Sequence, residues 1–289
     1  MDRESILPNG LTVHHLNKAS LALAYEDVFS RDQYLQHGMQ VRDGDCVFDV
    51  GANVGLFLLR INRALAHGRV FCFEPIGQIF RVLQNNASRH NHLDVQLINC
   101  GLAHRPGTAS FTFFPQSPTD SSMYAAADSE PVRDGQRDYI LNVLHGITPI
   151  RLGRLSRLGI SLLVPSAKRQ LARMIRWMVF RRRSVICRLS TLSDVIREHA
   201  IERIDLLKID AEFAEFDILG GLTALDWGRV RQVVVEVHGG AAAAFRMRDL
   251  LIGGGFDVEL EGDPIRPQNT MCYARRAGPG EIAIKIEDA

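Results

Sequence analysis

The stretch CVFDVGANVG, residues 46–55, decides the fold of this 289-residue chain. Its first five residues form a nearly continuous apolar run, which is typical of a strand covered by helices on both faces. Gly51 permits a tight turn after the strand, and Gly55 permits the next helix to approach the sheet closely. The stretch therefore predicts the strand, glycine turn and helix that begin a nucleotide-binding α/β unit.

Apolar runs of the same kind recur along the chain and alternate with helical patterns. Strands are expected at Cys46–Val50, Val70–Phe73, Val95–Asn99, Ile204–Asp210 and Val233–Val237. Helices are expected between them at Leu56–Ala66, Gln78–Arg89, Ala214–Leu222 and Ala241–Gly253. This order predicts an open, doubly wound, mostly parallel α/β sheet. The runs Phe256–Leu260 and Thr270–Arg275 have no helix between them and predict an antiparallel hairpin at the sheet edge.

The domain organisation follows from where this pattern begins and ends. Residues 46–275 hold the predicted cofactor-binding domain, residues 1–45 precede it as an extension, and residues 276–289 follow it as a tail. The extension contains a predicted helix near Ala19–Phe29 that caps the sheet or covers the site. Within the domain, residues 117–189 are predicted to form a lid loop and a basic helical insert.

The composition is that of an ordinary globular protein, with 46% hydrophobic and 23% charged residues and a formal net charge of +1. It excludes a disordered chain, a collagen and a coiled-coil rod. The first ten residues contain no apolar signal segment, and no apolar stretch reaches the roughly 18–20 residues of a membrane span. Five scattered cysteines without a CxxC spacing argue against a disulfide framework or a zinc site. We therefore expect a cytoplasmic protein.

The predicted second strand ends in Phe73-Glu74-Pro75, and an acid at this position is well placed to bind ribose hydroxyls. A dinucleotide fingerprint reads GxGxxG, but Asn53 occupies the position of its middle glycine. Asp49 offers a carboxylate to an ammonium group, which suits S-adenosylmethionine (SAM), a cationic ligand without phosphate. SAM is therefore favoured over a dinucleotide, and a purely structural glycine turn is the third interpretation.

A second set of polar residues follows the predicted fourth and fifth strands, at the edge where open α/β sheets bind ligands. The segment LLKIDAEFAE, residues 206–215, places Lys208, Asp210 and Glu212 there, and the fifth strand ends with Glu236 and His238. Lys208 and Glu236 lie inside strand runs, so buried charge pairs are the simplest interpretation of them. His238 is either a structural histidine or a catalytic one.

Five segments match the pattern of a known family: VFDVGANVG (47–55), FEP (73–75), STLSDVI (190–196), IDLLKIDAEFAE (204–215) and VVVEVH (233–238). In these segments the chain resembles the FkbM family of SAM-dependent methyltransferases. The resemblance implies a class I methyltransferase fold, Rossmann-like and mostly parallel, with an antiparallel edge hairpin. The cofactor-binding residues that it implies are Asp49, Gly51, Asn53 and Gly55 for the methionine end, Glu74 for the ribose, and Asn99 and Gly101 for adenine.

The family mostly O-methylates hydroxyl groups of natural products, sugars or carrier-bound intermediates, although N-methylating relatives exist. A hydroxyl acceptor must lose a proton as the new bond forms, so a general base is expected. Asp210 and His238 are the first candidates, and Glu212 is the next. A divalent metal on Asp210, Glu212 and Glu236 is a less favoured alternative, and we predict no metal. The family pattern KIDVEGAE reads KIDAEFAE here, so Phe213 is expected to alter the shape of the substrate site.

Two segments interrupt the matching pattern. Residues 117–138 are rich in Ser, Asp, Pro and Gly, which predicts either a substrate lid containing Tyr124 or a mobile surface loop. Residues 139–193 contain eleven Lys or Arg and no Asp or Glu, and Leu163–Arg183 within them predicts a basic amphipathic helix. This helix is expected to be a lid, a contact for an acidic carrier protein or a peripheral membrane contact. Nucleic acid is disfavoured as a partner because aromatic residues are few.

Together these features predict a SAM-dependent methyltransferase that acts on a hydroxyl group of a small-molecule acceptor, free or tethered to a carrier protein. The first rival is an NAD(P)-dependent oxidoreductase, which would need a glycine at position 53. The second is a non-catalytic partner-binding module, which the intact set of Asp49, Gly51, Gly55 and Glu74 disfavours. An N-methyltransferase of the same fold stays open.

Overall fold

A computed structural model of the chain describes residues 3–115, 117–124, 182–264, 266 and 268–276, together with five isolated positions between 166 and 174. Most of the predicted lid, most of the predicted helix at Leu163–Arg183 and the tail from residue 277 lie outside the described residues. Among the described helices, none has the length and apolar character that a membrane span requires.

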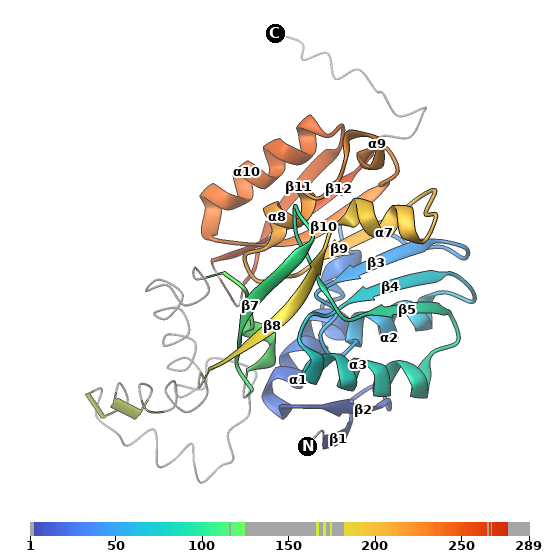
Figure 1. Ribbon diagram of the computed structural model, residues 1–289. Coiled ribbons are helices and arrows are strands. Elements are labelled where there is room, and N and C mark those ends of the chain that lie inside the picture. Colours follow the sequence, from blue (N-terminus) through green and yellow to red (C-terminus); the bar gives the residue numbers. More distant parts are fainter. Residues whose placement is uncertain are drawn as a thin grey trace.

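A seven-stranded sheet forms the centre of the molecule (Figure 1). Its five parallel strands are β3 (Cys46–Val50), β4 (Arg69–Phe73), β5 (Asp94–Ile98), β9 (Leu206–Ile209) and β10 (Gln232–His238). An antiparallel hairpin completes one edge, formed by β11 (Asp257–Gly262) and β12 (Asn269–Arg275). The order β11-β12-β10-β9-β3-β4-β5 changes direction between β3 and β9, as in doubly wound folds. The predicted α/β class and the edge hairpin are confirmed.

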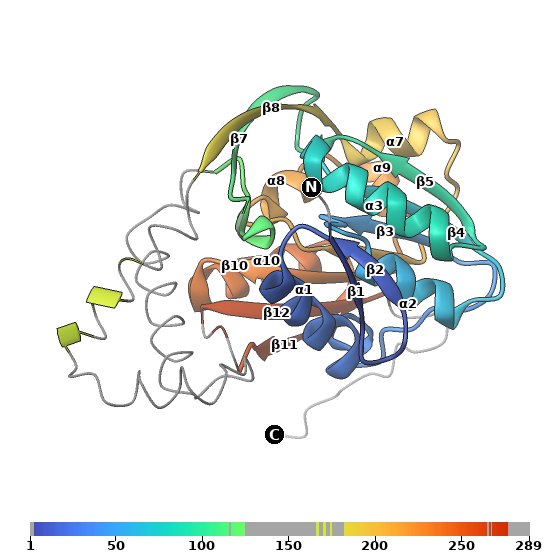
Figure 2. The same ribbon diagram turned by 90° about the horizontal axis from the view of Figure 1, so that it is seen from below.

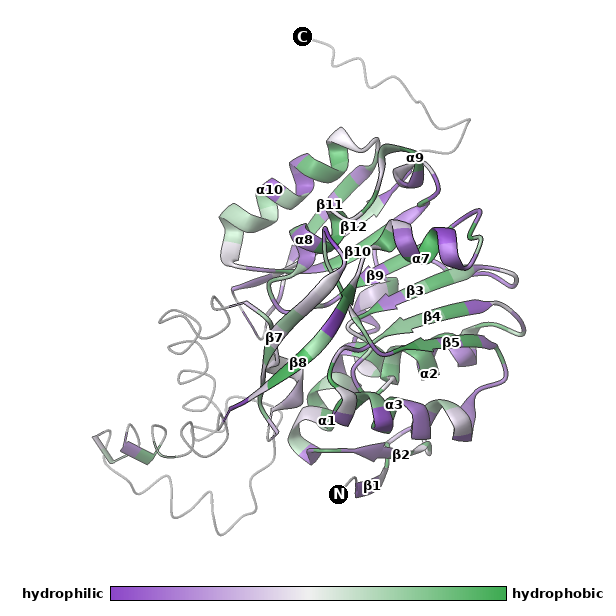
Figure 3. Cartoon of the chain, viewed as in Figure 1, coloured by the Kyte–Doolittle hydropathy of each residue, from purple (hydrophilic) through white to green (hydrophobic). Residues whose placement is uncertain are grey.

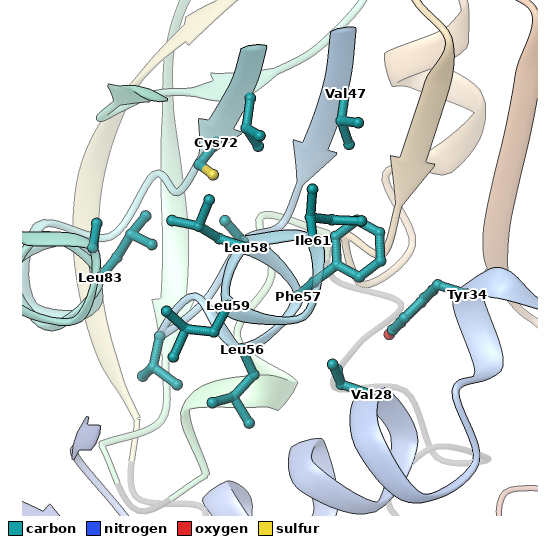
Figure 4. Close-up of a cluster of buried hydrophobic side chains, with 14 of the residues drawn as sticks. Val28, Tyr34, Val47, Leu56, Phe57, Leu58, Leu59, Ile61, Cys72 and Leu83 are labelled. Atoms are coloured by element: carbon teal, nitrogen blue, oxygen red, sulfur yellow. The ribbon is translucent and has the colours of Figure 1, made fainter. Parts of the chain in front are cut away.

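Helices cover both faces of this sheet because its central strands are apolar on both sides. On β3, Val47 enters one core cluster and the next residue, Phe48, enters the other. The first cluster contains side chains of α2 (Leu56–Ala64) and α3 (Gly77–His90), which Figure 4 shows close together. The second contains side chains of α7 (Leu192–Glu198), α8 (Glu215–Leu219) and α10 (Gly240–Gly253), and the short helix α9 (Ala224–Trp227) precedes β10. Figure 3 shows the hydrophobic colour that runs along the central strands.

A second, three-stranded sheet stands beside the central one. Its strands are β6 (Gly101–Leu102), β7 (Gly107–Phe113) and β8 (Arg183–Ser190), and β8 lies between the other two. β8 lies within residues 139–193, so the end of the predicted basic insert is a strand of the fold. Its buried Cys187 alternates with exposed neighbours, which is a strand signal that the run of arginines conceals.

The N-terminal extension begins with a hairpin of β1 (Arg3–Ile6) and β2 (Thr12–His15), which the sequence did not predict. Strand β2 packs against α3 (Figure 2). The predicted helix near Ala19–Phe29 is present as α1 (Lys18–Tyr25) and a π-helical turn (Glu26–Ser30). The 3-10 turn that follows carries Tyr34 into the first core cluster.

His37 connects this extension to the edge of the sheet through contacts with β11 and β12. Its ring nitrogens lie 2.7 Å from the carboxylate of Glu259 and 3.0 Å from that of Glu261, both on β11. Its ring also packs against Tyr273 of β12, with ring centroids 4.5 Å apart. Partial burial lowers the pKa of His37, but hydrogen bonds to Glu261 and Glu259 outweigh that effect and raise the pKa above its usual 6.5. The protonated imidazole therefore stabilises the fold.

Replacing His37 by Gln should lower stability in a pH-dependent way. Because the pKa of His37 is raised in the folded state, its contribution is fully present below the usual value of 6.5 and is lost as the pH rises through the folded-state pKa. The difference in melting temperature between the wild type and His37→Gln should therefore shrink as the pH is raised from weakly acidic to alkaline. His67→Gln, which changes an exposed histidine, is the control. An equal difference at every pH would contradict this role.

Candidate functional site

A cavity opens at the carboxyl ends of β3, β4 and β9, where the strand order changes direction. Its empty volume, including the part open to solvent, is about 610 Å³. The predicted site residues that line it are Gly51, Asn53, Glu74, Gly101, Asp210 and Glu212. The predicted site residues outside its lining are Asp49, Gly55, Asn99, Tyr124, Phe213 and His238. The structure thus divides the predicted set into residues that face the cavity and residues that stand behind it.

The glycine turn brings β3 and β9 into backbone contact. Gly51 has a φ of +77°, and a Cβ atom there would lie 1.8 Å from the carbonyl oxygen of Asp210. Gly55 has a φ of +88°, and a Cβ atom there would lie 2.6 Å from Cδ1 of Leu83. Asn53 also adopts the left-handed conformation, with a φ of +50°. Gly51 and Asn53 therefore form part of the cavity wall, whereas Gly55 lets α3 approach the start of α2 behind it.

Glu74 follows β4 with its side chain buried at the cavity wall. Its Oε1 atom accepts a hydrogen bond of 2.8 Å from the backbone N–H of Ile76, and burial raises its pKa to about 7. The amide of Asn99 donates to the carbonyl oxygens of Glu74 and Pro75, at 2.8 and 3.1 Å. Asn99 therefore fixes the backbone that carries Glu74, and Gly101 lines the adjacent part of the wall.

A buried lysine joins the two central strands beside the cavity. The Nζ atom of Lys208 lies 2.9 Å from the carboxylate of Asp49 and donates a hydrogen bond of 3.1 Å to the carbonyl oxygen of Gly51. Asp49 is fully buried, so its charge is matched by Lys208 and not by a ligand in the cavity. The interpretation of Lys208 as a member of a buried charge pair is confirmed.

Asp210, in contrast, exposes 27% of its side chain and lines the cavity. The hydroxyl group of Tyr34 donates a hydrogen bond of 2.7 Å to its Oδ2 atom. Burial raises the pKa of Asp210, but Lys208, His238 and the Tyr34 hydrogen bond outweigh that effect and hold the pKa below its usual value. Asp210 is therefore a carboxylate ion at neutral pH.

His238 lies behind the cavity lining, between two carboxylates. Its Nδ1 atom lies 2.6 Å from Oε1 of Glu215, and its Nε2 atom lies 3.4 Å from Oε2 of Glu212. The ring of Phe213, a residue with a left-handed φ of +69°, packs against the imidazole with centroids 5.4 Å apart. Burial lowers the pKa of His238, but Glu212 and Glu215 outweigh that effect and raise the pKa well above its usual value. The imidazole is therefore protonated at neutral pH, which does not suit a general base.

The start of the predicted lid borders the cavity. Ser121, Ser122 and Met123 line it, and the Ser122 hydroxyl donates a hydrogen bond of 2.6 Å to the carbonyl oxygen of Glu212. The backbone N–H of Tyr124 donates to the same hydroxyl at 3.1 Å. Tyr124 is thus adjacent to the cavity without lining it.

Two further contacts at the site, those of Tyr34 and Arg266, have no signal in the local sequence. Tyr34 lies 176 residues from its partner Asp210. A guanidinium nitrogen of Arg266 lies 3.3 Å from the carboxylate of Glu236, which also accepts a hydrogen bond of 2.7 Å from Asn269. Across the described part of the chain, no three His, Cys, Asp or Glu side chains are grouped to hold a metal ion.

The charge of the lining indicates which ligand fits the cavity. The described residues that line it include three acids, Glu74, Asp210 and Glu212, and no Lys or Arg. These carboxylates would repel the pyrophosphate of a dinucleotide. SAM carries an ammonium and a sulfonium group and no phosphate, and its ribose hydroxyls can donate to a buried carboxylate. The chemistry of the lining therefore fits SAM.

Alanine at position 51 should disrupt this site, whereas alanine at position 10 should only add backbone strain. Gly10 has a φ of +87° with no atom within 4 Å of its Cβ position, so Gly10→Ala should lower the free energy of unfolding by about 1–2 kcal/mol. Gly51→Ala adds the clash with the backbone of Asp210 and should cost about 3 kcal/mol or more. Urea unfolding measures both. Equal losses would show that the turn can move away from β9.

Comparisons with known proteins agree with the site. Residues 49–258 match the family model described as the methyltransferase FkbM domain. The chain is 35% identical to the 31-O-demethyl-FK506 methyltransferase FkbM of Streptomyces tacrolimicus, over 90% of each chain. It is 35% identical to the AMB antimetabolite synthetase AmbE of Pseudomonas aeruginosa, over 97% of this chain but 13% of that protein. It is 27% identical to the methyltransferase sdnD of Sordaria araneosa, over 94% of this chain and 96% of that one.

The family match covers strands β4, β5, β9 and β10, the glycine turn and the acidic edge described above. It confirms the predicted family and excludes the oxidoreductase alternative. Since the sheet order, the lining and the family agree, the chain belongs to the FkbM family, and it is a SAM-dependent methyltransferase with the class I fold.

Proposed function

We propose that this enzyme transfers a methyl group from SAM to a hydroxyl group of a natural product, a sugar or a biosynthetic intermediate, either free or tethered to a carrier protein. The observation that carries the proposal is that two carboxylates, Asp210 and Glu212, line the cavity together. A hydroxyl oxygen becomes a strong nucleophile only as its proton leaves, so it needs a base within hydrogen-bond reach. A neutral amine can attack before it loses a proton.

The names of the relatives support a biosynthetic acceptor. The Streptomyces tacrolimicus protein is named for 31-O-demethyl-FK506, and the Pseudomonas aeruginosa protein is an antimetabolite synthetase. The region that matches this chain is a small part of that synthetase, which supports an acceptor held by a biosynthetic assembly. The predicted helix at 163–183 stays a candidate contact for an acidic carrier protein or an anionic membrane, on residues that are mostly outside the described part.

Different lining residues bind different parts of the cofactor. When bound, SAM supplies a methyl group attached to a positively charged sulfur. The Glu74 carboxylate accepts hydrogen bonds from the ribose, Gly51 and Asn53 contact the methionine end, and Gly101 contacts the adenine side. Behind them, Asp49, Gly55 and Asn99 hold the turn and the two strand ends in place. The family resemblance suggests these assignments, and the lining, burial and charge of the residues support them.

Glu212 takes the proton of the acceptor. His238 stands outside the lining and is already protonated. Asp210 is held as an ion by Lys208 and Tyr34, which makes it a weak base and suits it to face a positive charge. Glu212 lines the cavity, and the imidazole of His238 orients it from behind. Phe213 and Tyr124 border the acceptor side.

Replacing Glu74 by Ala should weaken binding of the reaction product S-adenosylhomocysteine (SAH) by about 1.5–3 kcal/mol, because a charge-assisted hydrogen bond is lost. Titration calorimetry above pH 7, where the Glu74 carboxyl is ionised, measures the change. Glu198→Ala, which changes an exposed acid on α7, is the matched control. NAD and NADP should not bind. Unchanged affinity in Glu74→Ala would overturn the ribose assignment.

Replacing Glu212 by Gln should lower methyl transfer about 100-fold or more while SAH affinity stays within a few-fold, because the base is lost and the cofactor contacts stay. The assay uses SAM with a labelled methyl group and a panel of hydroxyl-bearing intermediates, offered free and as thioesters of a carrier protein. Amine analogues of the same compounds are run alongside. Methylation of the amines alone would replace this proposal by N-methyl transfer.

A further inference from the structure

We propose that Tyr34 is a positioning residue of the cofactor site: its hydroxyl group fixes the Asp210 carboxylate so that this carboxylate faces the positive end of SAM. The N-terminal extension then contributes a side chain to the site in addition to covering it. This inference rests on the proposed function, in which Asp210 lies beside that positive end. It concerns a residue that none of the five matching segments contains.

The contact between Tyr34 and Asp210 is short and buried. The Tyr34 hydroxyl donates to Oδ2 of Asp210 at 2.7 Å, and the tyrosine is 5% exposed. Lys208 approaches Asp210 only to 3.9 Å, because its short contacts go to Asp49 and to the backbone of Gly51. The tyrosine is therefore the close partner that sets the direction of the Asp210 carboxylate among the described contacts. It occupies one oxygen and leaves the other available to the cavity.

The ring of Tyr34 is itself held from two sides. It meets the ring of Phe57 edge to face, with centroids 5.3 Å apart, and Nζ of Lys208 lies 5.2 Å from its centroid. Figure 4 shows Tyr34 beside Phe57 in the core cluster around α2. A cation over an aromatic face is attracted to it, so the same ring also contacts the lysine that compensates Asp49.

The backbone that carries Tyr34 is anchored independently of Asp210. Arg60 of α2 makes two hydrogen bonds to the carboxylate of Asp32, at 2.8 and 3.0 Å. The hydroxyl group of Tyr273 on β12 donates to the carbonyl oxygen of Gln33 at 2.8 Å. The two residues that precede Tyr34 are thus fixed to a helix and to a strand. The position of the Tyr34 hydroxyl is therefore set before any ligand binds.

An oriented carboxylate should favour SAM over SAH. The two ligands share the adenosine and amino-acid parts, but only SAM has a positive charge on sulfur. The described lining contains no Lys or Arg, and the cations that partly offset the charge of Asp210, Lys208 and His238, stand behind that lining. Loss of the Tyr34 hydroxyl leaves the charge of Asp210 in place and removes the contact that aims it. The effect should therefore fall on SAM more than on SAH.

The test is calorimetric titration of SAM and of SAH into the full-length wild type and three variants: Tyr34→Phe, Tyr25→Phe and Asp210→Asn. Tyr34→Phe should weaken SAM binding about tenfold and SAH binding less than about threefold, as expected for one hydrogen bond to a charged group. Tyr25→Phe also removes a tyrosine hydroxyl from the N-terminal extension, but the Tyr25 ring stacks on Phe29, with centroids 5.2 Å apart, and has no described contact with Asp210. The ratio of SAM to SAH affinity should be unchanged in this control. SAH binding by Tyr34→Phe also shows that the variant is folded.

The Asp210→Asn variant distinguishes a failure of the role proposed for Tyr34 from a failure of the proposed placement of Asp210. A lowered ratio in Asp210→Asn with an unchanged ratio in Tyr34→Phe would overturn the role of Tyr34 alone. An unchanged ratio in Asp210→Asn would overturn the placement of Asp210 beside the positive sulfur, and the role of Tyr34 with it. Equal loss of SAM and SAH affinity in Tyr34→Phe would show a merely structural tyrosine. Loss of both ligands in the Tyr25→Phe control as well would point to the same conclusion.

Discussion

The ion pair between Lys208 and Asp49 holds together the two strands at which the sheet changes direction. Both side chains are buried, and removing one partner of such a pair typically costs about 3–5 kcal/mol because the other charge is left uncompensated. The same Lys208 Nζ atom also donates a hydrogen bond to the carbonyl oxygen of Gly51. One atom therefore holds both the Asp49 carboxylate and the glycine turn. The shape of the cavity therefore depends on a charge pair that lies outside the cavity lining.

Local patterns in the sequence were sufficient to predict most of the fold. Strands β3, β4, β9 and β10 are buried on both faces, so each appears as a short, largely apolar run between helical segments. Strand β8 was not predicted for a physical reason: it belongs to a sheet with one exposed face, on which Ile186 and Arg188 are exposed to solvent. Its arginines continue the basic stretch that precedes it, and this continuity conceals the alternation of buried and exposed residues that indicates a strand.

The site was predictable only where it follows directly from strand ends. Gly51, Glu74 and Asp210 line the cavity because the carboxyl ends of parallel strands meet at one edge. A strand end fixes a backbone position but not the direction of a side chain, which explains why His238 reaches the edge and yet turns to Glu215. Tyr34 could not be predicted at all, since no spacing relates residues that lie 176 positions apart.

The close approach of Gly51 to the backbone of Asp210 constrains how this enzyme can change. No side chain fits between the two strands, so the floor of the cavity cannot be altered by substitution without moving the sheet itself. The walls are different, because Phe111, Met123 and Ile218 present side chains that can be exchanged one at a time. The cavity can therefore be reshaped through its walls, whereas position 51 has to remain glycine.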